Sequence, residues 1–529
     1  MSEPFDFIVV GSGPCGAIAA NTLVSGGARV QMLDAGILPE DAFSSSTKTN
    51  YEQKRKEGIS NSDYFLGNDA ADLLSDDIST GAQLTPSRKF MVSRVRELLP
   101  LLSDSFFPME SLSYGGLGNG WGLGCCVFSE AELKRCGLDP QKMHLAYKEV
   151  AELIGISGAD DDAAQYTCGK LQGIMKPLQM DRNASGLLNA YTGKRADLNR
   201  KGFYLGRPSL ALLTEPKDNR SAYRYDDLDF YSNDDTSAWR PRVMLEKLKG
   251  NANFNYSGNA FVKGYSENEG IIRVSYTDLR DSSEKEAFCR KLILASGTLG
   301  TARLVLRSSE KRDSALPLIC NPYYYIPSIQ WRMIGKGLGE KPVGLAQLSL
   351  FEDRDNKNED VAMGSIYSYH SLMLYRLILQ APLDMRSSAK IFRNLLPALT
   401  IFGIHHPESA GSGRFQYNGK AFSASYEHND EMNAQVIKRN KRFVSVIKKL
   451  GCYPVRTVDP GFGASIHYAG TLPFAEGEEP FSLDPTGRLH GSKNIYVADG
   501  SGFRYLPAKG LTFSLMAWAH VVAKNLISK

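Results

Sequence analysis

The sequence contains no long hydrophobic run and no marked excess of charge of either sign. No stretch of about 18 uncharged apolar residues occurs, which excludes a membrane-spanning bundle. The chain has 62 Lys and Arg residues against 58 Asp and Glu, and a net charge of +4 over 529 residues gives no indication of a nucleic-acid partner. The 42% of hydrophobic residues is typical of a globular protein and excludes wholesale disorder.

Cysteine is scarce and is not arranged for metal binding or redox chemistry. The eight cysteines include no C-x-x-C pair, so the sequence gives no support to a zinc ribbon or a thioredoxin-like site, and we expect no metal. The adjacent Cys125 and Cys126 are interpreted as small buried residues. The N-terminal MSEPFDFIVV lacks a basic region before its apolar residues, so we expect a first strand and a cytoplasmic protein with free thiols.

A glycine motif near the N-terminus is the strongest local feature. A short apolar strand over residues 7–10 leads into GSGPCG at 11–16, which is followed by a helical stretch over 17–23. A second strand is predicted over 28–33, and it ends at Asp34. A G-x-G-x-x-G motif between strand and helix, with an acid after the next strand, predicts a dinucleotide-binding unit. A tight turn without a ligand is the alternative.

Each residue of this unit has a mechanical purpose. Gly11 allows a sharp turn, Gly13 lets the backbone approach a pyrophosphate, and Gly16 lets helix and strand pack closely. The first N–H groups of the helix attract phosphate, and Asp34 accepts hydrogen bonds from a ribose. The unit stands at the start of the chain, where flavoproteins commonly place it, so we expect FAD.

The pattern predicts an α/β fold, with nucleotide-binding units at both ends of the chain and an antiparallel-sheet domain between them. A buried strand at 494–498 runs into Asp499 and then a long helix over 512–526, which resembles the N-terminal unit. An Asn-Gly turn at 418–419 between alternating segments predicts a hairpin. The predicted domains are FAD-binding for 1–40, 105–150, 236–310 and 464–529, insertions or a lid for 41–104 and 151–235, and substrate-binding for 311–463.

Residues 372–404 contain two apolar helical stretches, which are interrupted by Pro382 and Pro397. We interpret them as packed helices. The alternative is a lid or a weak membrane-surface contact, because basic residues flank the apolar ones. These basic residues are Arg376, Arg386, Lys390 and Arg393.

Five sequence blocks follow one another along nearly the whole chain: GSGPCG at 11–16, YGGLGNGW at 114–121, ILASGTLGT at 293–301, HYAGT at 467–471 and VADGS at 497–501. Their sequences and order resemble those of the glucose–methanol–choline (GMC) oxidoreductases, and the loop with Gly115, Gly116 and Trp121 resembles the sugar-oxidising, pyranose-oxidase-like branch more than the others. The resemblance implies a Rossmann-type FAD-binding domain of discontinuous segments and an antiparallel-sheet substrate domain.

The resemblance implies non-covalent FAD, because Gly120 stands where some members link a histidine to the flavin. It places the N-terminal motif at the pyrophosphate and ribose and the loop over 116–121 under the flavin. It places the C-terminal block against the pyrophosphate and the flavin ring. The backbone of Val262 is implied to meet the adenine. The implied cofactor-binding residues are Gly11, Gly13, Cys15, Gly16, Asp34, Gly116, Asn119, Trp121, Val262, Gly297, Asp499, Gly500, Thr512 and Phe513.

His467 is the candidate catalytic base among eight histidines. Histidine suits proton abstraction near neutral pH, and the resemblance places the HYAGT block before the flavin. His405 and His406 are adjacent and are expected to point different ways, which argues against a metal site. His520 falls in the last helix, where we expect packing or a surface position.

The sequence departs from the family at the second catalytic position. Most members carry His or Asn there, and this chain carries Gly510, followed by Leu511 in place of the usual Pro. Lys509 is the only functional side chain nearby. It is a candidate catalytic ammonium, and a surface position is the alternative, because lysine is rarely buried without a partner.

The function predicted from these features is FAD-dependent oxidation of an alcohol, most plausibly of a sugar or sugar derivative. His467 would take the hydroxyl proton while the carbinol hydride passes to flavin N5. The sequence leaves the electron acceptor open. Two alternatives stay open as well: an FAD-dependent reductase or desaturase acting on a C–C bond, and a non-catalytic flavoprotein-like binding module.

Overall fold

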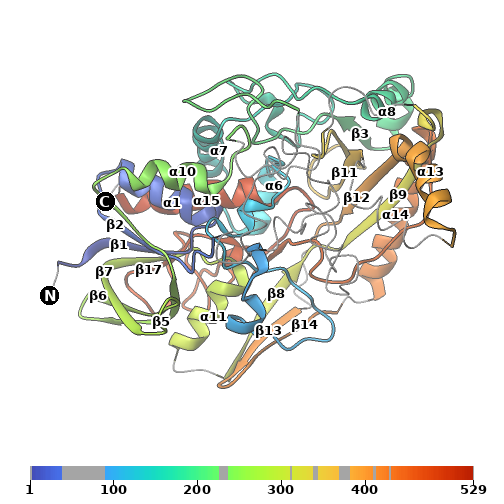
Figure 1. The fold of residues 1–529 in the computed structure, drawn as a ribbon. Helices are drawn as coiled ribbons and strands as arrows, with labels where there is room; N and C mark the ends of the chain where they lie inside the picture. The colour runs from blue at the N-terminus through green and yellow to red at the C-terminus, as the bar shows by residue number, and fades with distance from the viewer. Residues whose placement is uncertain are drawn as a thin grey trace.

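The structure, a computed structural model, describes residues 3–38, 90–225, 236–309, 313–336, 343–368, 382–408, 413–427 and 430–527. Three β-sheets organise these residues, and helices cover the first sheet and the outer face of the second (Figure 1). Most of the insertion predicted over 41–104 lies outside the described residues.

The first sheet has seven strands in the order β4-β2-β1-β7-β6-β5, with β17 beside the end of β7. β4, β2, β1, β7 and β17 run parallel, whereas β6 pairs antiparallel with β5 and β7. The parallel strands are short and apolar because both faces of such a sheet are covered. Their bounds are β1 (Phe5–Val10), β2 (Val30–Leu33), β4 (Phe254–Ser257), β5 (Ala260–Asn268), β6 (Ile271–Asp278), β7 (Glu284–Leu294) and β17 (Ile495–Val497).

The helix that follows the glycine motif, α1 (Pro14–Ser25), packs against the C-terminal helix α15 (Thr512–Ile527). Both helices are apolar around most of their circumference, which explains their burial in the core. α7 (Pro140–Ile154) packs on α15, and α10 (Pro241–Lys249) packs on α1. α11 (Thr298–Ser308) packs on β5. The predicted N-terminal and C-terminal strand–helix units are therefore present and lie side by side.

The second sheet is antiparallel and has six strands in the order β15-β9-β12-β11-β10-β3. One face packs on α8 (Arg182–Thr192) and α14 (Asp430–Lys449) through apolar side chains such as Phe402 and Ile404. Because side chains alternate along a strand, the residues adjacent to Phe402 and Ile404 in the sequence face the opposite side of the sheet. The bounds are β3 (Phe203–Gly206), β9 (Tyr323–Gln330), β10 (Leu348–Glu352), β11 (Ala362–Ser368), β12 (Leu399–His405) and β15 (Cys452–Pro454).

The third sheet has four strands in the order β14-β13-β8-β16. The Asn-Gly turn predicted at 418–419 joins β13 to β14, and Gly419 has φ +81°. β16 pairs with the end of β8, with Tyr468 opposite Cys320. The bounds are β8 (Asp313–Cys320), β13 (Gly413–Asn418), β14 (Phe422–Ser425) and β16 (Tyr468–Ala469).

The short helices are α5 (Val95–Leu98), η5 (Gly116–Asn119), α6 (Glu130–Cys136), η6 (Cys168–Lys170), α9 (Arg195–Arg200), η7 (Trp331–Met333), η8 (Leu396–Ala398) and η9 (Gly500–Gly502).

The segment predicted to hold two helices has one described helix, α13 (Met385–Leu395), and then the strand β12. The helical prediction is wrong after Pro397, because the β-favouring LTIFGIH sequence pairs there with both β9 and β11. Residues 369–381 lie outside the described part of the chain.

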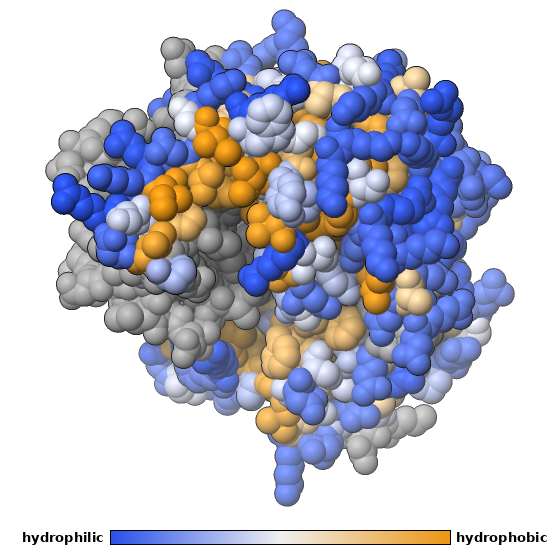
Figure 2. All heavy atoms as spheres, turned by 90° about the vertical axis from the view of Figure 1, so that its right-hand side faces the viewer, coloured by the Kyte–Doolittle hydropathy of each residue, from blue (hydrophilic) through white to orange (hydrophobic). Residues whose placement is uncertain are grey.

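The α13 side of the molecule faces the viewer in Figure 2, where apolar and hydrophilic surfaces alternate. Exposed apolar side chains on η7 and α13 include Trp331 and Ile391. Among the described helices, none combines the length and apolarity needed to span a bilayer. Contact of this side with a membrane surface stays a prediction.

Candidate active site

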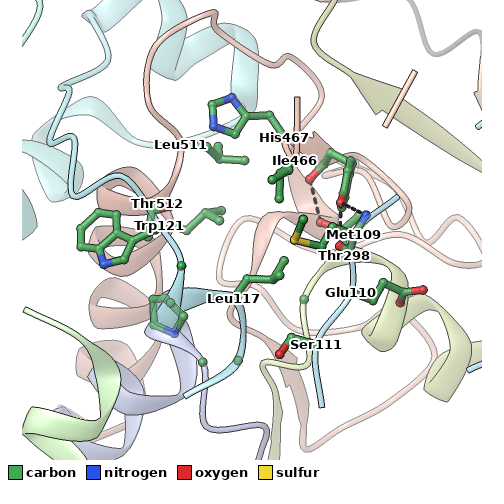
Figure 3. A pocket seen from close by; sticks show the side chains of 18 of the residues that line it. Met109, Glu110, Ser111, Leu117, Trp121, Thr298, Ile466, His467, Leu511 and Thr512 are labelled. Atoms are coloured by element: carbon green, nitrogen blue, oxygen red, sulfur yellow. Dashed lines mark hydrogen bonds between the residues drawn. The ribbon is translucent and has the colours of Figure 1, made fainter. Parts of the chain in front are cut away.

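A cavity of about 750 Å³ lies where the carboxyl ends of β1, β2 and β7 meet the second sheet. Its volume is in the range of small-molecule and cofactor sites. Residues that are far apart in the sequence converge on it: His467, Ile466 and Leu511 lie at one end in Figure 3, and Glu110 and Ser111 lie at the other. The dinucleotide-binding unit and the candidate base therefore face the same space.

The three motif glycines differ in what surrounds them. Gly11 has φ +99°, and a Cβ there would lie 2.7 Å from the carbonyl oxygen of Ala295. A Cβ on Gly16 would lie 1.9 Å from the carbonyl oxygen of Gly11, so this glycine allows the helix to approach the strand. A Cβ on Gly13 would meet no protein atom within 4 Å, because it would project into the cavity. Gly13 thus leaves room for another molecule to reach the helix N-terminus.

Asp34 lines the cavity at the end of β2. Its carboxylate accepts hydrogen bonds from the Ser12 hydroxyl at 2.5 Å and from the Tyr256 hydroxyl at 3.0 Å. Burial raises the pKa of Asp34 to about 6, although both hydroxyls oppose that shift. The group is therefore ionised at neutral pH and can accept hydrogen bonds from the hydroxyl groups of a ribose. Sequence reasoning missed both partners.

The glycine-rich loop reaches the N-terminal motif. Gly115 and Gly116 have φ +94° and +55°, and a Cβ on Gly116 would lie 3.4 Å from the Cα of Gly13. Trp121 lines the cavity, and its indole N–H donates to the carbonyl of Trp239. Asn119 does not line the cavity; its amide donates to the Tyr114 carbonyl at 2.8 Å and holds the loop in shape.

The C-terminal block closes the cavity from the other side. Buried Asp499 accepts hydrogen bonds from the hydroxyls of Thr301 at 2.5 Å and Ser501 at 2.6 Å. Phe513 lies behind the wall, where its ring stacks on Tyr147. Of the residues implied to bind the cofactor, Gly16, Asn119 and Phe513 lie behind the cavity wall. Those that line it are Gly11, Gly13, Cys15, Asp34, Gly116, Trp121, Val262, Gly297, Asp499, Gly500 and Thr512.

His467 lines the cavity just before β16, and its Nδ1 atom lies 3.2 Å from Oδ1 of Asn321. The Asn321 amide nitrogen donates to the carbonyls of His406 and Leu506, so its oxygen must face the imidazole. Nδ1 therefore carries the proton and Nε2 keeps its lone pair. Burial lowers the pKa of His467 from the ordinary 6.5 to about 4, so the ring is neutral at pH 7.

His405 and His406 point to opposite faces of the second sheet, as the sequence predicts. His405 lines the cavity, whereas His406 is buried behind it, with Nε2 at 3.0 Å from Oδ1 of Asn440. No group of three metal-ligating side chains occurs in the part of the chain that the structure describes. His520 bridges helices, with Nδ1 near Thr22 and Nε2 near Glu149, in agreement with a packing role.

Lys509 occupies neither of the two positions considered from the sequence. It is fully buried, and its ammonium donates to Glu132 at 2.6 Å, to Asn358 and to the carbonyl of Val127. It does not line the cavity, although the neighbouring Gly510 does. Since its three donors have these acceptors, Lys509 joins the C-terminal segment to α6 and to the loop after β10.

Comparison with known proteins agrees with this architecture. Residues 426–519 match the family model described as GMC oxidoreductase. A solved structure of Aspergillus oryzae RIB40 formate oxidase, described as a study of how a mutation affects FAD modification, covers 100% of this chain and 98% of its own. The TM-score is 0.61 at 13% sequence identity, so this likeness concerns the fold. The search of curated proteins returned no significant match.

Residues 426–519 thus match the family that the sequence blocks predict, and the fold of the whole chain is similar to that of a formate oxidase. The cavity fits FAD, the cofactor that the family resemblance implies. The open space at Gly13 accepts a pyrophosphate at the start of α1, and the Asp34 carboxylate suits a ribose. Membership of the sugar-oxidising branch stays a prediction.

The open cradle at Gly13 predicts a variant that folds but binds FAD poorly. Gly13→Val introduces a side chain where the pyrophosphate must lie, and overpacking of 1–3 kcal/mol weakens binding by roughly 10- to 100-fold. Gly13 has φ −62°, so valine adds no backbone strain. Gly477→Val is the matched control, because Gly477 is exposed and a Cβ there would also meet no atom within 4 Å. Bound FAD is quantified after gel filtration; full occupancy in Gly13→Val would contradict the assignment.

The buried Lys509–Glu132 pair predicts a stability defect. Lys509→Met leaves the Glu132 carboxylate buried without its cation, which costs about 3–5 kcal/mol of unfolding free energy. The double variant Lys509→Met, Glu132→Gln removes that charge and should recover most of the loss. Chemical denaturation measures both. A stable single variant that has lost substrate-driven flavin reduction would instead place Lys509 in the reaction.

Proposed function

We propose that the protein oxidises an alcohol, in a sugar or sugar derivative, to the carbonyl compound, with His467 as the base. The observation that carries this proposal is the position of the His467 imidazole, held by Asn321, in the same cavity as the dinucleotide cradle. A hydroxyl group loses its proton reluctantly, so removal of the carbinol hydrogen as hydride needs a base at the oxygen. His467 provides one nitrogen for this purpose, Nε2.

Bound FAD supplies the two-electron acceptor for the carbinol hydride. The chain's own task is to take the hydroxyl proton at Nε2 of His467. As the proton arrives, positive charge develops on the imidazole, and the Nδ1–H bond to Asn321 strengthens because it becomes charge-assisted. Asn321 is thus a positioning residue. It fixes the tautomer, holds the ring and stabilises the charged form.

The walls of the cavity favour a ring that carries hydroxyl groups. Tyr323, Tyr325 and Tyr367 line the side formed by the second sheet, together with the polar Ser365. Aromatic faces suit the C–H surface of a sugar ring, and hydroxyls and imidazoles suit its oxygens. The sheet supplies both kinds of group because alternate residues of β9 and β11 reach the same face.

Replacement of His467 tests the base directly. His467→Ala should retain FAD and lose substrate-driven flavin reduction by about 10²–10⁴-fold, the usual contribution of a positioned base. The assay is anaerobic mixing with a panel of sugars, polyols and aromatic alcohols; formate is included because the similar solved structure is that of a formate oxidase. The exposed His144→Ala is the control. An unimpaired His467→Ala would favour chemistry on a C–C bond, and a protein without flavin would favour a binding module.

The lowered pKa of His467 predicts the acid limb of the pH profile. The base works only when neutral, and burial holds its pKa near 4, so protonation occurs at lower pH than for an ordinary histidine. We expect kcat/KM for flavin reduction to stay level from about pH 8 to about pH 5 and to fall below that. Bound FAD is measured at each pH, because Asp34 gains a proton near pH 6. An inflection near 6.5 with FAD still bound would contradict a desolvated base.

A further inference from the structure

The cavity holds a second imidazole whose role the proposed reaction does not explain. The ring of His405 stacks on the ring of His467, with centroids 4.8 Å apart and planes inclined by 25°. His405 ends β12 of the second sheet, whereas His467 precedes β16 of the third sheet. Both rings line the cavity. Two separate sheets therefore bring a pair of imidazoles to the place where the hydroxyl group must bind.

The local structure holds His405 in this position. Tyr323 is the register partner of His405 on β9, and its ring centroid lies 4.5 Å from that of the imidazole. Gly403, two residues earlier on β12, makes this packing possible, because a Cβ there would lie 2.7 Å from the Tyr323 hydroxyl. The imidazole thus contacts the rings of both Tyr323 and His467, and this packing fixes its orientation.

Both imidazoles present hydrogen-bond acceptors. Burial is the main cause that lowers the pKa of His405 well below 6.5, and the neighbouring His467 lowers it further, so the ring is neutral. A neutral imidazole has one N–H and one lone pair. A hydrogen bond between the His405 ring and the backbone of Ser465 acts in the opposite direction and raises the pKa of His405. This bond uses the N–H of His405, just as the bond to Asn321 uses the N–H of His467. Each ring therefore uses its N–H on the protein and keeps one acceptor nitrogen.

We propose that His405 accepts a hydrogen bond from a second hydroxyl of the substrate, next to the one that His467 deprotonates, so that the enzyme selects vicinal diols. This inference rests on the proposed alcohol oxidation and narrows its substrate class. Two acceptors on stacked rings match two donors on adjacent carbons. A simple alcohol satisfies only His467 and leaves the His405 nitrogen without a donor in a buried cavity.

The expected discrimination follows from that unsatisfied acceptor. A site built to hydrogen-bond a hydroxyl group rejects an analogue that lacks it, since its own polar group is then left unpaired. One neutral hydrogen bond, together with the cost of the unpaired partner, corresponds to roughly 10- to 100-fold in kcat/KM. The wild-type enzyme should therefore favour a diol over the matched alcohol by about that factor.

Two variants of the holoenzyme test the role of the nitrogen. His405→Phe keeps an aromatic ring between Tyr323 and His467 but has no acceptor, whereas His405→Gln has a carbonyl acceptor and no ring. The probes are cis- and trans-1,2-cyclohexanediol against cyclohexanol, and D-glucose against 2-deoxy- and 3-deoxy-D-glucose. Anaerobic flavin reduction is measured against probe concentration, which separates effects on the apparent affinity for the probe from effects on the limiting rate of reduction. Bound FAD and thermal stability are recorded for each variant.

We expect the diol preference to fall toward one in His405→Phe and to survive in part in His405→Gln. A merely structural role gives the opposite order, because Phe preserves the stack better than Gln. Equal use of diol and alcohol by the wild type, or an unchanged preference in His405→Phe, would overturn the inference and leave alcohol oxidation intact. Failure of every probe and of the whole sugar and alcohol panel to reduce the flavin would overturn both.

Discussion

The hydrogen bond between Asn321 and Nδ1 of His467 is the interaction on which the proposed reaction depends. It decides which nitrogen of the imidazole is free, and an imidazole with its tautomer reversed could not accept a proton at the same point in space. The bond depends in turn on the pairing of β16 with the end of β8, which sets His467 beside Asn321. Two backbone carbonyls occupy the amide nitrogen of Asn321, so the asparagine cannot rotate without losing them.

The two larger sheets divide the work of the site between them. The parallel sheet ends in glycine turns and a helix N-terminus, which suit phosphate, and carries Asp34 for a ribose. The antiparallel sheet turns one face, which carries tyrosines, toward the cavity. Its opposite face carries apolar residues that pack on helices. A parallel sheet with both faces covered could not provide such a surface. The cavity between them therefore has one end suited to a nucleotide and one wall suited to a hydroxylated ring.

The sequence predicted the arrangement of those residues that belong to one contiguous motif. The turn at Gly11, the following helix and Asp34 lie within one strand–helix–strand unit, so their spacing predicts their arrangement. His467 was selected because its neighbours form a block of known order, and it lines the same cavity. The prediction of helix after Pro397 was wrong because pairing with two strands outweighed the local pattern.

The residues that sequence reasoning missed act through partners from other parts of the chain. Asn321 follows a strand as an isolated asparagine, and nothing near it in the sequence indicates a histidine 146 positions away. The ion pair of Lys509 joins residues 377 positions apart, which explains why a buried partner for this lysine was not predicted. His405 and His406 could be expected to point different ways, yet the stacking of His405 on His467 depends on how two sheets meet. Such contacts are products of tertiary structure and have no local signature.

Nuclear magnetic resonance of the holoenzyme labelled with ¹⁵N-histidine measures directly whether His467 is neutral at pH 7 with its proton on Nδ1. Comparison with His467→Ala assigns the signals among the eight histidines. The account predicts a neutral imidazole at pH 7, with the proton-bearing nitrogen identified as Nδ1 and Nε2 as the unprotonated one. A proton on Nε2, or an imidazolium at pH 7, would contradict it, because His467 would then have no lone pair to receive the hydroxyl proton.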